Sequence, residues 1–255
     1  MKVATWNVNS VKVRLPLLLD WLDAAKPDVV CLQEIKCLAA DFPLMELRGH
    51  GYRAEIVGQK SYNGVALLSK EPARDVITAL PGDGGDSQAR YLEASFGDIR
   101  IATIYLPNGN PVDSDKYRYK LAWLERLRAH AVTLLHQERP FVLAGDYNVI
   151  PEPEDVYDPV AWREDALFRT ETRRAYRGLV NLGLTDAFRA FHAEPHRYSF
   201  WDYQAGRWQR DEGLRIDHLL LSPQAADRLV AADIDKTPRD KDKASDHTPV
   251  WCELN

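Results

Sequence analysis

Short apolar runs rich in β-branched residues recur along the chain and predict β-strands. These runs lie at Lys2–Asn7, Asp28–Glu34, Gly64–Ser69, Ile99–Leu106, Pro140–Asp146, Leu214–Leu221 and Thr248–Leu254. Several of them are apolar on both faces, as in residues 99–106, which indicates sheets that are covered on both sides. We therefore expect strands that are buried inside a layered protein.

Helical periodicity appears between these runs, most clearly from Asp115 to about His136. Two further helices are predicted at Leu15–Ala25, with Pro16 in the first turn, and at Glu171–Leu182. Turn-rich stretches such as residues 80–85 join neighbouring strands directly. The pattern favours an α/β fold built as a layered sandwich over a simple doubly wound sheet.

The composition fits one globular domain over residues 1–255, because 45% of the residues are apolar and 28% are charged. No run of about 18 consecutive apolar residues is present, so we expect neither a transmembrane helix nor a membrane partner. The first ten residues do not read as a signal peptide, and the three cysteines form no C-x-x-C pair. The sequence therefore predicts a soluble, cytoplasmic protein.

Polar side chains stand where the predicted strands end. Asn7, Glu34, Tyr105, Asn108, Asp146 and Asn148 end or follow four of the strands. In open α/β folds ligands bind beyond the carboxyl ends of strands, so these groups are expected to meet at one rim. Residues 245–247 (SDH) precede the last strand and reach the same rim if that strand is antiparallel. Asp217 lies within an apolar strand and needs a partner.

The rim residues are mostly oxygen donors, which suits a hard divalent cation. Asn7, Glu34, Asp146, Asn148 and Asp246 offer carboxylate and amide oxygens of the kind that Mg²⁺ prefers. Zinc, which favours Cys and His, fits them poorly. A cation of this kind, a carboxylate that activates water and donors that hold phosphoryl oxygens are the parts needed to cleave a phosphate ester.

Six ordered sequence blocks resemble the signatures of the exonuclease III family of DNA-repair nucleases, within the endonuclease/exonuclease/phosphatase superfamily. The blocks are WNVN at residues 6–9, LQEIK at 32–36, YLPNG at 105–109, GDYNV at 145–149, LRID at 214–217 and SDH at 245–247. The resemblance runs essentially from end to end. It implies a four-layer α/β sandwich, with two packed mixed β-sheets flanked by helices, like that of deoxyribonuclease I.

The resemblance also implies roles for the rim residues. The implied metal site comprises Asn7, Glu34, Asp146, Asn148, Asp246 and His247. The implied catalytic residues are Tyr105, Asp146, Asn148, Asp217 and His247. Asp146 would orient or deprotonate the attacking water, with Tyr105 as the alternative base. His247 would contact the scissile phosphate, oriented by Asp217, and Asn108 would bind that phosphate together with Asn148.

A second set of residues concerns the choice of substrate. Phe200, Trp201 and Leu214 resemble the walls of the family's pocket for a flipped-out abasic sugar, which excludes a normal nucleotide by size. The family often carries tryptophan where this chain has Phe200 or Leu214. The net charge of −5 does not attract a polyanion, so contacts to DNA must come from basic residues clustered on one part of the surface. The candidates are Lys36, Lys116 and Arg118, then Arg90, Arg207 and Arg210.

The sequence therefore predicts a Mg²⁺-dependent apurinic/apyrimidinic endonuclease of base excision repair, with Mn²⁺ as a substitute cation. It is expected to act as a monomer on double-stranded DNA, cutting 5′ to abasic sites. Exonuclease activity in the 3′→5′ direction and removal of blocking groups from 3′ ends are expected as well. Two alternatives stay open: a phosphatase or phosphodiesterase for a small or lipid substrate, and a DNA-end-binding module without catalysis. Residues 150–169 could touch DNA or merely cover the fold.

Overall fold

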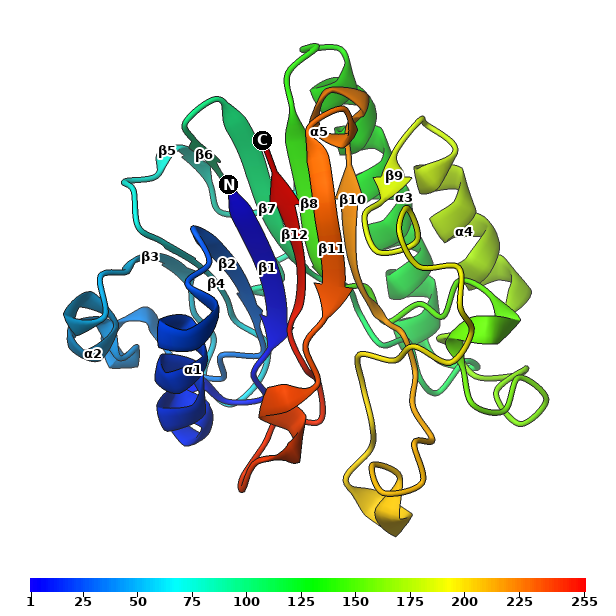
Figure 1. Ribbon diagram of the computed structural model, residues 1–255. Coiled ribbons are helices and arrows are strands. Elements are labelled where there is room, and N and C mark those ends of the chain that lie inside the picture. The colour runs from blue at the N-terminus through cyan, green and yellow to red at the C-terminus, as the bar shows by residue number, and fades with distance from the viewer.

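The computed structural model describes residues 1–255 and contains two six-stranded mixed β-sheets (Figure 1). The first sheet has the order β11 (Leu229–Ile234), β12 (Val250–Leu254), β1 (Lys2–Asn7), β2 (Val29–Gln33), β4 (Val65–Ser69) and β3 (Arg53–Val57). The second has the order β5 (Arg74–Ile77), β6 (Tyr91–Phe96), β7 (Ile99–Tyr105), β8 (Phe141–Asp146), β10 (Asp217–Leu221) and β9 (Thr185–Asp186).

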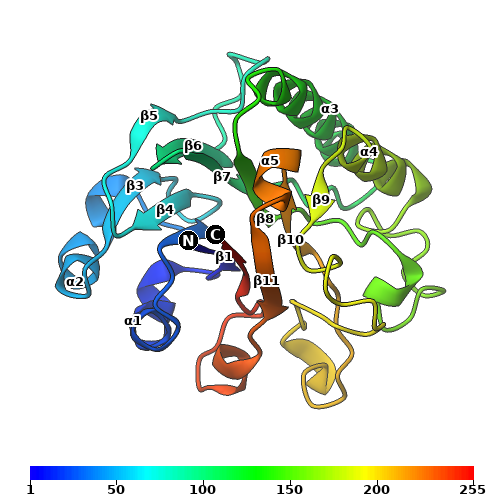
Figure 2. The same ribbon diagram turned by 45° about the horizontal axis from the view of Figure 1, so that its top comes forward.

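Helices cover the two outer faces (Figure 2). The α-helices are α1 (Val11–Ala25), α2 (Leu44–Gly49), α3 (Asp115–Leu135), α4 (Thr170–Val180) and α5 (Pro223–Ala226). Four short 3-10 helices lie at Ala39–Asp41, Pro153–Asp155, Gln204–Gly206 and Thr237–Asp240. α1 and α2 pack on the first sheet, and α3 and α4 pack on the second. No helix is both long and apolar enough to cross a lipid bilayer.

Three apolar clusters follow from this layering. The central cluster joins the facing sides of the sheets, for example Val3 and Cys31 of the first with Ile101 and Val142 of the second. The two outer clusters join each sheet to its helices. Burial of both faces explains why β2, β4 and β8 are buried along their whole length. The predicted four-layer sandwich is confirmed.

Strand direction brings the predicted rim together. β1 and β2 are parallel neighbours, and β7 and β8 are parallel neighbours in the other sheet. β12 runs antiparallel to β1, so the start of β12 reaches the end of β1. β10 runs antiparallel to β8, with Asp217 directly opposite Asp146. Tyr105 pairs with Asp146 on the other side of β8.

All seven predicted strands are present, but two details of the prediction were wrong. β10 begins at Asp217 rather than at Leu214, because Leu214 instead makes isolated bridges to Val156 and Phe200. α1 begins at Val11, four residues before the predicted start, so Pro16 lies in the second turn of the helix. Five further strands were not predicted: β3, β5, β6, β9 and β11. In β3 and β5 most side chains are partly or fully exposed, so the apolar pattern is weak.

Candidate active site

The two sheets are joined at the rim by one amide group. Asn7 Nδ2 lies 2.9 Å from Glu34 Oε1 and 3.0 Å from Asp146 Oδ2, and donates a hydrogen bond to each. Glu34 follows β2 in the first sheet, whereas Asp146 ends β8 in the second. The amide therefore holds two carboxylates from different sheets beside each other.

The backbone at the ends of β2 and β8 is shaped to present these groups. Glu34 and Asn148 adopt left-handed conformations, with φ of 49° and 48°, which turn the chain sharply after each strand. Gly145 allows β8 to lie against β7, since a Cβ at this position would stand 1.9 Å from the Ile104 carbonyl oxygen. These features place the side chains of Glu34, Asp146 and Asn148 at the rim.

His247 and Asp217 form a buried pair beside Asp146. His247 Nδ1 lies 2.9 Å from Asp217 Oδ2, and its Nε2 lies 3.7 Å from Asp146 Oδ2. Ser199 Oγ donates a 2.6 Å hydrogen bond to the same Asp217 oxygen. Asp217 thus fixes the ring of His247 and leaves Nε2 facing the rim.

Burial and neighbouring charges shift the titration of this group. Burial raises the pKa of Asp146 to about 7; the charge of His247 opposes this rise and that of Asp217 adds to it. Burial alone would lower the pKa of His247, but the charges of Asp217 and Asp146 outweigh it and raise that pKa to about 10. The imidazole is therefore a cation at neutral pH. Strongly shifted groups in one pocket are typical of functional sites.

The asparagines and Tyr105 complete the rim. Two hydrogen bonds hold Asn148 in place. Its backbone N–H donates to Asp146 Oδ1 at 2.9 Å, and its Nδ2 donates to the Leu106 carbonyl oxygen at 2.9 Å. Asn108 Nδ2 donates to Asn148 Oδ1 at 3.2 Å. Burial, followed by the charges of Glu34 and Asp146, raises the pKa of Tyr105 well above its ordinary value. Tyr105 is therefore a neutral phenol here.

Most of the rim residues line one pocket of about 360 Å³. Its walls include Glu34, Tyr105, Asn108, Asp146, Asn148, Phe200, Leu214, Asp246 and His247. The ring of Phe200 meets that of His247 edge to face, with centroids 4.9 Å apart. An apolar wall thus adjoins the acidic rim directly.

Comparison with known proteins identifies the family. The model of the endonuclease/exonuclease/phosphatase family matches residues 4–247. This chain belongs to that family. It is 32% identical to exodeoxyribonuclease III of Haemophilus influenzae, with both chains covered in full. The structure of an AP endonuclease from Archaeoglobus fulgidus superposes with a TM-score of 0.96 at 37% identity, covering 100% of this chain and 99% of the other.

A third relative was solved with a nucleic acid. The 3′ phosphatase NExo from Neisseria, bound to a product DNA hairpin, is 38% identical and superposes with a TM-score of 0.96. The comparison covers 100% of this chain and 99% of the Neisseria chain. The fold of the present chain is therefore similar over its whole length both to that of a structure named as an AP endonuclease and to that of one named as a 3′ phosphatase.

Six predicted site residues do not line the pocket. Asn7 and Asp217 lie directly behind it and hold Glu34, Asp146 and His247 in place, and the other four are Lys36, Lys116, Arg118 and Trp201. Trp201 is fully buried and donates from Nε1 to Asp211, so it supports the segment behind Phe200 and was wrongly expected in the pocket wall. Lys36 Nζ pairs with Glu34 Oε2 at 2.8 Å. Lys116 and Arg118 are exposed at the start of α3 and do not line the pocket.

Segment 150–169, which the sequence left as either a DNA contact or a cover of the fold, supplies part of the pocket wall. Tyr157, Trp162, Asp165 and Leu167 line the pocket. The segment is anchored by Asp155, which is fully buried and receives two hydrogen bonds from the buried guanidinium of Arg215, at 2.7 and 3.2 Å. Arg215 within LRID was the sequence signal for this anchor, since a charge there needs a buried partner.

The donor set fits a divalent cation. Acidic residues outnumber basic ones in the pocket: Glu34, Asp146, Asp165, Asp202, Glu212 and Asp246 face Arg207 and His247. Arg207 is paired with Glu212. Such a pocket repels a phosphate diester unless a bound cation offsets the charge. Carboxylate and amide oxygens are ligands suited to Mg²⁺ and Mn²⁺.

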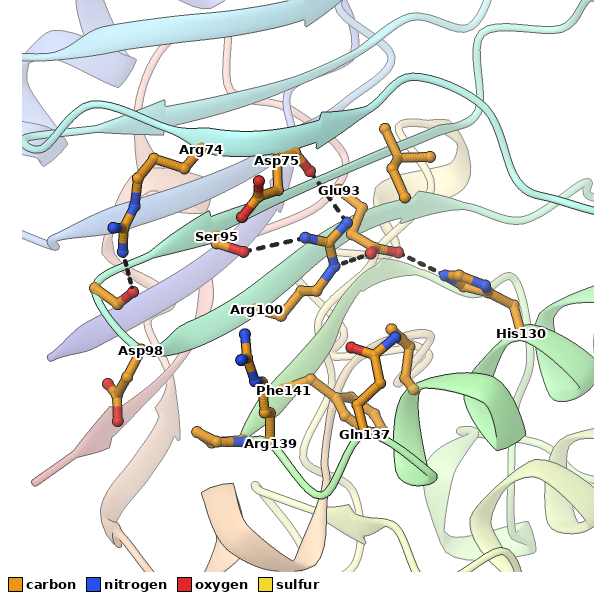
Figure 3. A pocket seen from close by; sticks show the side chains of 14 residues that line it. Arg74, Asp75, Glu93, Ser95, Asp98, Arg100, His130, Gln137, Arg139 and Phe141 are labelled. Carbon is orange, nitrogen blue, oxygen red and sulfur yellow. Dashed lines mark hydrogen bonds and ion pairs between the residues drawn. The ribbon is translucent and has the colours of Figure 1, made fainter.

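A larger polar pocket of about 420 Å³ lies at the opposite ends of β7 and β8 (Figure 3). At its inner wall the buried Glu93 bonds to His130 Nε2 at 2.6 Å, to Arg100 and to the hydroxyl of Tyr91. Burial alone would raise the pKa of Glu93, but the hydrogen bonds from His130 and Tyr91, together with nearby positive charge, lower it. Glu93 is thus a fully satisfied carboxylate that ties β6 to α3.

Proposed function

We propose that this protein is a metal-dependent DNA-repair hydrolase that cuts the phosphodiester 5′ to an abasic site and leaves a 3′-hydroxyl. It also removes nucleotides, phosphates and other blocking groups from 3′ ends. Membership of the family and the names of the relatives support DNA phosphodiester chemistry. The observation that carries the proposal is Asp146, held 3.7 Å from the imidazolium of His247 inside a pocket with an apolar wall.

Asp146 is the proposed base that orients and deprotonates the attacking water. Its raised pKa of about 7 makes it a stronger base than an ordinary aspartate, yet still available near neutral pH. Tyr105 is disfavoured in this role because its pKa is well above the ordinary value and a phenolate would face two carboxylates. We therefore assign Tyr105 to binding a phosphoryl oxygen through its hydroxyl.

The remaining donors hold the phosphate. His247 Nε2 donates a hydrogen bond to a phosphoryl oxygen, and its positive charge stabilises the charge that develops as the bond to the leaving oxygen breaks. Asn108 and Asn148 present amide groups at the same rim and fix the orientation of the diester. Asp217 acts on His247 alone.

The proposed cation is Mg²⁺, with Mn²⁺ as a substitute. Glu34, Asp246 and Asn7 would hold it, with the carboxylate of Asp146 nearby. When bound, the cation supplies positive charge to the scissile phosphate and to the leaving oxygen. Lys36 pairs with the outer oxygen of Glu34 and so directs the inner oxygen toward the rim.

The apolar wall is the proposed site of damage recognition. Phe200, Leu214 and Trp162 line the same pocket as the acidic rim and bound a space suited to a sugar without its base. A normal nucleotide placed there would bring a base against the aromatic wall. Exclusion by size is a physical route to selecting abasic sites and frayed 3′ ends.

We further propose that residues 1–255 act as one domain and as a monomer in the cytoplasm. The eighteen residues that line the pocket include the carboxylates, the imidazole and the apolar wall to which the roles above are assigned. The three cysteines are buried free thiols, which suits a reducing compartment. Lys116, Arg118, Arg90 and Arg210 are proposed as contacts to DNA phosphates around the rim.

One assay tests the proposal. Purified protein is mixed with a duplex carrying one abasic site, with undamaged duplex, with a 3′-phosphate duplex and with a phosphoinositide, each with and without Mg²⁺. We expect Mg²⁺-dependent incision 5′ to the abasic site and removal of the 3′ phosphate. Preference for the phosphoinositide would assign the protein to a different branch of the family, and binding of DNA without any cleavage would leave it a binding module.

A further inference from the structure

Lys120 lies in the second turn of α3 and is completely buried behind the active site. Its Nζ donates to the backbone carbonyl of Asn108 at 2.9 Å and to that of Asn148 at 2.5 Å. Both acceptors are neutral groups. Burying an amine against neutral carbonyls costs free energy compared with leaving it in water, and an apolar side chain would serve the packing of α3 better. Packing alone therefore does not explain why this position holds a lysine.

The two carbonyls belong to separate loops. Asn108 follows β7 and Asn148 follows β8, and both side chains line the pocket. Above the lysine the two amides are linked, because Asn108 Nδ2 donates to Asn148 Oδ1 at 3.2 Å. Lys120 is the contact that joins the same two residues through their main chains. The pair is thus fixed at its main chains by the amine of Lys120 and at its side chains by a hydrogen bond between the two amides.

Gly109 is matched to the lysine. Its φ is +92°, and a Cβ at this position would stand 2.6 Å from Lys120 Cδ. The loop after Asn108 therefore passes directly over the lysine stem, and only glycine allows this close passage. Gly109 and Lys120 therefore fit each other where the Asn108 loop packs on α3.

We propose that Lys120 is a positioning residue that sets the distance and orientation of Asn108 and Asn148 for the scissile phosphate. The inference rests on the proposed function, since it assigns these amides to phosphate binding. It does not depend on the charge of the lysine, because an uncharged amine keeps two N–H donors and needs two. Lys120 touches no substrate. Its effect passes through the two asparagines.

Lys120→Met tests this proposal, because methionine keeps a long unbranched stem and loses both donors. We expect kcat on an abasic duplex to fall about 100-fold, since a misplacement of about 1 Å has effects of this size, while KM changes little. Leu127→Ala is the matched control. Leu127 is fully buried on the same helix and lies in the outer core cluster, away from the asparagines. Leu127→Ala should lower Tm, but at temperatures below its unfolding transition its kcat should equal that of the wild type.

A double-mutant cycle with Asn108→Ala separates positioning from general stability. If Lys120 acts through the asparagines, the fold-decrease in kcat of the double variant Lys120→Met/Asn108→Ala is much smaller than the product of the fold-decreases of the two single variants. Leu127→Ala combined with Asn108→Ala should show the product. The proposal would be overturned if the effects of Lys120→Met and Asn108→Ala on kcat simply multiplied, or if kcat of Lys120→Met were near normal. A wild-type protein without phosphodiesterase activity would instead overturn the proposed function.

Gly109→Ala gives the same test without removing the lysine. The added methyl group displaces the lysine stem or lifts the loop, so kcat should fall as in Lys120→Met. It keeps the proposal testable if Lys120→Met does not fold. Gly97→Ala is its control, because Gly97 also has a positive φ, of 58°, but a Cβ there meets nothing within 4 Å. Equal kcat in the Gly109 and Gly97 variants would contradict the proposal.

Discussion

His247 Nδ1 lies 2.9 Å from Asp217 Oδ2, and both side chains are almost completely buried. The carboxylate comes from the first residue of β10, and the histidine precedes β12 in the other sheet. This pair therefore fixes the relative position of the sheets at the rim. Because Asp217 also raises the pKa of His247, one contact sets both the orientation and the charge of the imidazole.

Asp217→Asn should move the alkaline limb of the pH–activity profile to lower pH. Burial alone lowers the pKa of His247 and the charge of Asp217 raises it, so removing that charge lets the value fall from about 10 toward 6.5. A charged hydrogen bond of about 1.5–3 kcal/mol corresponds to about 1–2 pH units. The measurement is kcat/KM against pH. Asp227→Asn, at an exposed site, is the control, and an unmoved limb in Asp217→Asn would contradict the assignment.

Asp146→Asn should abolish cleavage while leaving DNA binding nearly unchanged. The amide cannot accept a proton from water, so we expect kcat to fall by about 10³-fold or more. Asp202→Asn is the matched control, because Asp202 lines the same pocket but is exposed and contacts only the nearby backbone of Gln204. Turnover and equilibrium binding on the same abasic duplex decide the matter. Near-normal turnover in Asp146→Asn would return the role of base to Tyr105.

The sequence predicted the rim because its residues stand at strand ends, where the local pattern is strong. It missed Lys120, although this lysine lies three residues after Tyr117 and four before Leu124 and so falls on the buried side of α3. Residue type outweighs helical position in such an interpretation, because a lysine in a stretch with Lys116 and Arg118 is taken for a DNA contact or for part of a solvated face. A buried charge on an apolar stripe was the available signal.

The walls of the pocket were harder to predict for a different reason. Phe200, Leu214 and Val156 meet through isolated bridges between irregular segments, and no periodicity in the sequence records such contacts. Phe200 and Trp201 were both assigned to the wall from the resemblance of their segment to the family's pocket, yet neighbouring residues of an extended segment point to opposite sides. Only three-dimensional packing distinguishes the two rings.

Trp162→Ala should weaken discrimination between damaged and undamaged DNA. Trp162 lines the pocket and meets Tyr157 edge to face, with ring centroids 6.5 Å apart. Removal of its ring therefore enlarges the space beside the rim. We expect the ratio of incision at abasic sites to incision of undamaged duplex to fall about tenfold, a typical effect of changed pocket size. Val160→Ala in the same segment is the control, since Val160 is 71% exposed. An unchanged ratio would remove Trp162 from damage recognition.

Glu93→Gln should destabilise the protein without changing the chemistry. Glu93 bonds to His130, Arg100 and Tyr91, and replacing its charge breaks a buried ionic cluster worth about 3 kcal/mol of unfolding free energy. The cluster lies at the far end of β7 from the rim, so kcat should stay the same.

The pH dependence of stability gives a second measure of the same cluster. The pKa of Glu93 is lowered in the folded protein, because its hydrogen bonds and nearby positive charge outweigh burial. Its contribution is therefore complete above the ordinary value of 4.5 and disappears as the pH falls below it. Denaturant melts of the wild type and Glu93→Gln should differ most at neutral pH and converge in acid. Glu71→Gln, at an exposed site, should match the wild type throughout, and a constant gap for Glu93→Gln would show that packing, not charge, accounts for the loss.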